Sequence, residues 1–137
     1  MHVRRLALLA LLMILALVLA SCGGSSAGGG SSFTYSGTWV GTIVDSVAGP
    51  GTVTATMSQS GSNLVGTWQS TFADGSNGGT LAGLIRTNDV IIELYPSNPM
   101  YCPYAVVGNR SGATLSGTYA AFNCTMVITG TLNISKQ

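Results

Sequence analysis

Apolar and hydroxyl-bearing residues alternate along the chain from about residue 35 to its end. Between Tyr35 and Ile43 every second residue is apolar or glycine, and the intervening residues are Ser, Thr and Val. The same period returns in the segments 51–59, 63–72 and 125–134. A period of two is that of a β-strand, whose successive side chains point to opposite faces. Because no helical period follows residue 32, the pattern predicts an all-β domain.

Eight strands are predicted, separated by short breaks rich in Gly, Asn, Asp and Pro. These residues tolerate positive φ or cannot continue a strand ladder, so each break ends one strand. The expected strands are Tyr35–Asp45, Gly51–Gln59, Asn63–Phe72, Gly79–Arg86, Val90–Tyr95, Tyr104–Asn109, Thr114–Phe122 and Thr125–Ile134. Such short connections favour antiparallel pairing of consecutive strands, in a meander.

The two faces of these strands differ in polarity, and this difference predicts how the sheet closes. One face is apolar and the other carries mostly Thr and Ser. A membrane barrel needs an apolar outer face, so here the hydroxyl face should be wet and the apolar face internal. Eight strands in a meander favour a small closed up-and-down barrel, which leaves no exposed edge strand. A two-sheet sandwich is the alternative.

The first residues indicate export. Arg4 and Arg5 precede an unbroken apolar segment, Leu6–Leu19. As a helix this segment would be about 21 Å long, against a hydrocarbon core of about 30 Å. A cleaved signal peptide is therefore favoured over a permanent membrane anchor.

Leu19-Ala20-Ser21-Cys22 follows this segment directly and resembles the lipobox of bacterial lipoproteins. The resemblance implies cleavage after residue 21, a diacylglycerol on the Cys22 sulfur and further acylation, for example by palmitate. Gly23 follows the cysteine, where the sorting rule of enteric bacteria implies the outer membrane. An ordinary signal peptide with a chance cysteine is the alternative.

The chain is therefore expected to have three parts. Residues 1–21 form the signal peptide, residues 22–32 a lipidated Cys and Gly/Ser tether, and residues 33–137 the β-barrel domain. The tether has no apolar residue larger than Ala27, so it cannot bury a core. Its root-mean-square reach is about 17–20 Å, which would hold the barrel off a bilayer surface.

Charged and catalytic residue types are scarce after residue 21. Three basic and four acidic residues give a net charge of −1, so no basic patch favours nucleic acid. The only His is His2, which removes His-based nucleophile activation and the usual zinc sets. Asp45, Asp89 and Glu93 could pair as in glycoside hydrolases, but strand ends or solvated faces are the preferred interpretation. We expect no enzyme, no metal and no cofactor.

The cysteines divide into one lipid site and one pair. With Cys22 assigned to the lipid, Cys102 and Cys124 remain. An exported protein is in a compartment that permits disulfides. The meander puts both cysteines at one end of the barrel, so we predict a disulfide, provided that the loop before Tyr104 folds across that end.

A Gly-Thr-aromatic motif recurs in the strands, as "SGTWVG", "LVGTWQS" and "LSGTYAA". Gly37-Thr38-Trp39 resembles the Gly-x-Trp opening of lipocalin-like and avidin-like barrels, and Leu64-Val65-Gly66-Thr67-Trp68 is similar to a second avidin-like strand. The resemblance implies a small barrel with Trp39 closing one end. The later tryptophans of the avidin group and the final Arg of lipocalins are absent, so biotin is not implied. The domain also resembles uncharacterised envelope lipoproteins.

Two functions fit these features. A tethered barrel could bind a small apolar ligand through the inward residues Trp39, Trp68, Tyr119 and Met57, or those side chains could simply fill it. Alternatively, the loop from Tyr95 to Tyr104 could contact an envelope protein or inhibit a hydrolase. Its aromatic and sulfur-bearing residues have the composition of an interaction hot spot, and they are Tyr95, Met100, Tyr101 and Tyr104.

Overall fold

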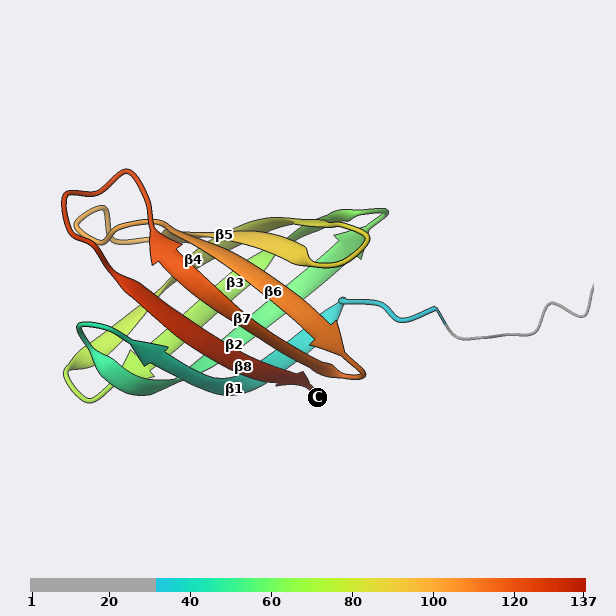
Figure 1. Ribbon diagram of the computed structural model, residues 1–137, viewed down its shortest axis with the longest axis horizontal. Coiled ribbons are helices and arrows are strands. Elements are labelled where there is room, and N and C mark those ends of the chain that lie inside the picture. Colours follow the sequence, from blue (N-terminus) through green and yellow to red (C-terminus); the bar gives the residue numbers. More distant parts are fainter. Residues whose placement is uncertain (1–31) are drawn as a thin grey trace, which may run out of the picture. The chain divides into compact units, whose positions relative to one another are not determined.

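Eight antiparallel strands close into one barrel in the computed structural model, which describes residues 32–137 (Figure 1). The strands are β1 (Gly37–Asp45), β2 (Gly49–Ser60), β3 (Asn63–Phe72), β4 (Gly75–Ile85), β5 (Val90–Pro96), β6 (Tyr104–Ser111), β7 (Thr114–Ala121) and β8 (Thr129–Lys136). Each strand pairs with its neighbours in sequence, and β8 pairs with β1. The predicted up-and-down barrel is thus confirmed in place of a sandwich. The predicted signal peptide, the lipid site expected at Cys22 and the predicted tether to residue 31 lie outside the described residues.

Within residues 32–137, the structure contains no helix of the length and apolarity needed to cross a membrane.

The predicted alternation places the core inside the barrel. Residues at every second position of β1, β2 and β3 are buried or half-buried, and their neighbours, largely Thr and Ser, are exposed. Facing positions on β2 and β3 pair Thr52 with Thr71 and Thr56 with Thr67 on the outer surface. The hydroxyl face is therefore the wet face, as the sequence predicts.

The last strand begins later than predicted. Residues 125–128 were expected in it, but β8 begins at Thr129 and residues 122–128 form a loop. Met126 is consequently 54% exposed, although its parity predicts an inward side chain. The loop contains Cys124, whose disulfide to Cys102 holds this segment beside another loop, and Asn123 takes a φ of 52°. The bridge thus holds the loop away from the strand ladder.

One end of the barrel is closed by aromatic side chains. The segment before β1 enters at this end, on the right in Figure 1. Trp39 is fully buried; its Nε1–H donates to the carbonyl of Tyr35 over 2.8 Å, and the two rings stack 5.9 Å apart. Phe33 packs edge-on against both rings, and the Arg110 guanidinium lies 4.0 Å from its ring centroid. We call this the closed end; Trp39 lies where the Gly-x-Trp resemblance implied.

The opposite end, called the mouth, is formed by four connections. They are the turns 46–48 and 73–74 and the loops 97–103 and 122–128. Cys102 and Cys124 join the two loops, with their Cα atoms 5.7 Å apart. The predicted disulfide is confirmed, and the loop before β6 folds across this end as the pairing requires. Closing a loop of this length contributes about 3 kcal/mol by the chain-entropy estimate.

Candidate functional site

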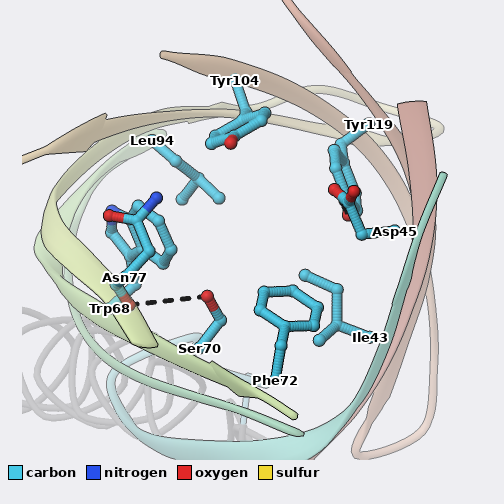
Figure 2. A pocket seen from close by; sticks show the side chains of 9 residues that line it. All are labelled: Ile43, Asp45, Trp68, Ser70, Phe72, Asn77, Leu94, Tyr104 and Tyr119. Atoms are coloured by element: carbon cyan, nitrogen blue, oxygen red, sulfur yellow. Dashed lines mark hydrogen bonds between the residues drawn. The ribbon is translucent and has the colours of Figure 1, made fainter. Parts of the chain in front are cut away.

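A space large enough for a ligand lies at the mouth. A cavity of about 340 Å³ is lined by residues from all four mouth connections, and we call it the mouth cavity. Beneath it, inside the barrel, is an inner cavity of about 30 Å³ (Figure 2). The two share Asp45, Phe72, Asn77 and Tyr104 as lining residues, so they adjoin.

The middle of the barrel is packed. A further cavity there measures about 30 Å³ and has an entirely apolar lining that includes Met57 and Trp68. An apolar void of this size binds neither a drug-sized ligand nor ordered water. The inward side chains therefore fill the middle of the barrel; they include Trp39, Leu64, Met57 and Trp68. Ile128, which parity also places inside, lies in the mouth loop.

A carboxylate is buried where the two cavities meet. Asp45 ends β1 on its inward face and is 9% exposed. Its Oδ1 accepts the backbone N–H groups of Val47 and Ala48, at 2.8 and 3.0 Å, which shapes the turn into β2. Burial acts to raise the pKa of Asp45, but hydrogen bonds from Tyr119, Ala48 and Val47 outweigh it, and the pKa lies below its ordinary value. Asp45 is therefore ionised at neutral pH.

Tyr119 provides the third hydrogen bond. Its hydroxyl donates to Oδ2 of Asp45 over 2.6 Å, between β7 and the end of β1. Gly130 on β8 makes this possible, because a Cβ there would lie 2.3 Å from Cζ of the Tyr119 ring. Burial and the bond to Asp45 raise the pKa of Tyr119, so the pair persists as a carboxylate and a neutral phenol.

Three more aromatic rings complete the inner cavity. Trp68, Phe72 and Tyr104 surround it with Tyr119, as Figure 2 shows. The Tyr104 ring meets Trp68 edge-on at 6.4 Å and Tyr119 edge-on at 5.6 Å. The Trp68 Nε1–H donates to the carbonyl of Thr80 at 3.1 Å, which fixes its ring. Burial, then the charges of Asp45 and Tyr101, raise the pKa of Tyr104.

The structure separates the ligand residues that the sequence predicts. Trp68 and Tyr119 line the inner cavity. Met57 lies in the packed middle of the barrel, and Trp39 lies at the closed end. Only two of the four predicted residues, Trp68 and Tyr119, therefore lie at the inner cavity, which adjoins the mouth cavity.

The predicted interaction loop is divided in a similar way. Met100 and Tyr101 line the mouth cavity, and Tyr104 lies deeper, at both cavities. Tyr95 stands apart, because its hydroxyl donates to Glu93 on the outer surface and its ring meets Phe122. The loop is thus part of the cavity wall as well as an exposed surface.

Sequence reasoning missed the site role of Asp45. Parity could have found it, since Trp39, Gly41 and Ile43 point inward and residue 45 continues that series. Asp45, Asp89 and Glu93 were the candidates for a catalytic pair of carboxylates, but no two of them lie close together. Asp89 pairs with Arg86 in the turn at the closed end, and Glu93 lies on the outer face of β5. The polar side chains Ser70 and Asn77 of the inner cavity were also not anticipated.

A second groove, of about 360 Å³, lies at the closed end beside Phe33 and the turn 86–89. Its charged groups already have partners within the chain: Arg86 pairs with Asp89, and Arg110 lies over Phe33. The mouth is therefore the better candidate site.

No protein-family model matches the chain, and no curated protein is significantly similar to it. The function is consequently argued from the geometry of the site.

Proposed function

We propose that the protein is a lipid-anchored lipoprotein of the outer membrane of the bacterial cell envelope, and that its barrel binds a small ligand in the mouth cavity. The observation that carries the binding proposal is a cavity of about 340 Å³ that leads to buried Asp45 and its aromatic neighbours. Ligand sites in proteins combine this size with a mostly apolar wall and a few placed polar groups. The anchoring proposal rests on the lipobox resemblance at Cys22.

Anchoring through Cys22 and ligand binding at the mouth would involve opposite ends of the barrel. The chain enters the barrel at the closed end, and the mouth is at the other end. A tether attached before Phe33 therefore leaves the mouth accessible from the aqueous side. The protein is proposed to act by binding rather than by catalysis, without a cofactor, because Asp45, Asp89 and Glu93 lie apart and no His follows residue 2.

Tryptophan emission tests ligand binding. The chain has only two tryptophans, and one of them, Trp68, lines the inner cavity. The barrel, residues 33–137, is titrated with fatty acids, lipid fragments, quinones and biotin. A saturable change in emission is expected with at least one class, confirmed by calorimetry. Trp68→Phe should weaken this binding with little loss of fold, whereas Trp39→Phe should lower stability and leave the affinity unchanged.

A second candidate function is protein binding at the mouth. Five large apolar side chains are exposed around it and form what we call the apolar rim: Val47, Met100, Tyr101, Met126 and Val127. Met100 and Val127 are 90% and 89% exposed. Met-rich apolar surfaces are typical of adaptable interaction sites. Flat emission and no heat of binding with every ligand class would contradict the ligand proposal and favour the rim.

A further inference from the structure

The polar groups of the inner cavity point to the charge of the ligand. Oδ1 of Asp45 accepts two backbone N–H groups, whereas Oδ2 accepts only the Tyr119 hydroxyl. A carboxylate oxygen has two acceptor positions, so one position on Oδ2 has no donor among the described residues. Asp45 lines both the inner and the mouth cavity, so a ligand that enters from the mouth meets this side chain.

No cation of the described residues compensates Asp45. The residues lining the two cavities include Asp45 and Asp74 but neither Lys nor Arg. All three basic side chains of residues 32–137 belong to the closed end: Arg86 follows β4, Arg110 lies near the end of β6, and Lys136 ends β8. The mouth therefore has a negative potential, which apolar walls strengthen.

The aromatic rings add to this preference. Trp68, Phe72, Tyr104 and Tyr119 are arranged around the cavity beside the carboxylate (Figure 2). Ring faces attract organic cations, and aromatic cages recognise quaternary and methylated ammonium groups. A neutral donor such as an alcohol could donate a hydrogen bond to Asp45 but would lack the attraction between opposite charges, and an anion would be repelled by Asp45.

We propose that the mouth takes an organic ammonium ion, with its charged nitrogen at Asp45 Oδ2 among the four rings and its apolar body in the mouth cavity. This inference rests on the proposed ligand-binding function and names the chemical class of the ligand. The mouth cavity of about 340 Å³ suits a short alkyl body, and Met100 and Tyr101 line its wall.

Three probes of equal length and different charge test the inference. The full chain, processed in its host and held in phospholipid nanodiscs, is titrated calorimetrically with hexylammonium, 1-hexanol and hexanoate, and empty nanodiscs supply the blank. We expect hexylammonium to bind at least about tenfold more tightly than hexanol, and hexanoate to bind most weakly. Equal affinities for hexylammonium and hexanol would overturn the inference and leave the binding proposal intact. No heat with any probe would count against both the inference and the binding proposal.

A matched pair of variants tests whether the charge of Asp45 attracts the ammonium ion. Asp45→Asn should lower hexylammonium affinity about tenfold or more and change hexanol affinity less than about twofold. Asp89→Asn removes the same charge at the closed end and should leave both affinities unchanged. Equal losses in the two variants would mean that net charge, rather than Asp45, attracts the cation, and would overturn the assignment. If Asp45→Asn does not fold, the comparison of the three probes on the unaltered chain still decides the matter.

Discussion

Removing the Tyr119 hydroxyl tests whether Asp45 is held as a carboxylate inside the barrel. The hydroxyl donates to Asp45 over 2.6 Å, between side chains that are 5% and 9% exposed. A hydrogen bond to a charged group contributes about 1.5–3 kcal/mol, and a neutral one about 1 kcal/mol. Because Asp45 keeps two backbone donors, we expect Tyr119→Phe to lower the free energy of unfolding by about 2 kcal/mol at pH 7.

The pH dependence separates this bond from a packing effect. Burial acts to raise the pKa of Asp45, and the bonds from Tyr119, Ala48 and Val47 together lower it below the ordinary value. A carboxyl whose pKa falls on folding contributes stability above its unfolded pKa, about 3.9, and that contribution is lost as the pH falls through the folded pKa. Without the Tyr119 hydroxyl, fewer hydrogen bonds offset the effect of burial, and the pKa of Asp45 in the folded protein rises. The difference between wild type and Tyr119→Phe should therefore shrink as the pH falls through the two folded pKa values of Asp45. It should approach about 1 kcal/mol once Asp45 is protonated in both proteins, because the bond is then one between neutral groups.

Urea denaturation of both proteins at pH 7, 5, 4 and 3 measures this difference directly. Tyr95→Phe is the matched control, since its hydroxyl meets Glu93 on the exposed surface. Its effect should stay within about 0.5 kcal/mol at every pH, as for most surface substitutions. A Tyr119→Phe difference that keeps its full pH 7 size at pH 3 would refute the reasoning, because packing alone would then account for it.

Two further predictions concern the barrel wall and the anchor. Gly66→Ala should lower the free energy of unfolding by about 1–3 kcal/mol in urea denaturation, because the new Cβ would lie 1.9 Å from the carbonyl oxygen of Thr56. Thr67→Ala is the control, since Thr67 is exposed on the same strand. An equal loss of stability in both variants would contradict the steric explanation. Cys22→Ser should abolish detergent-phase partitioning and leave an uncleaved or soluble protein; a variant that is still processed and still fractionates with membranes would show that the lipobox interpretation is wrong.

The sequence determined the architecture because a period of two is a local property of the chain. The alternation in residues 35–43 and 63–72 specifies which side chains point inward, and short Gly- and Asn-rich breaks leave consecutive strands only antiparallel pairing. Because the apolar face must be internal and an unpaired edge strand is unfavourable, the eight strands are expected to close into a barrel. The Cys102–Cys124 pairing also followed, because the meander places both cysteines at one end.

The site depended on contacts that no local pattern specifies. Asp45 and Tyr119 are 74 positions apart, and they meet only because β8 pairs with both β1 and β7 and carries Gly130 between them. The sequence left open whether the inward side chains fill the barrel or leave a chamber, since parity assigns side chains to the inside without saying how much volume they fill. Only the packed structure shows that the middle is full and that space remains at the mouth, where the disulfide holds residues 122–128 away from the strand ladder. Strand identity is encoded along the chain, whereas cavity volume and buried polar pairs arise from distant segments packed together.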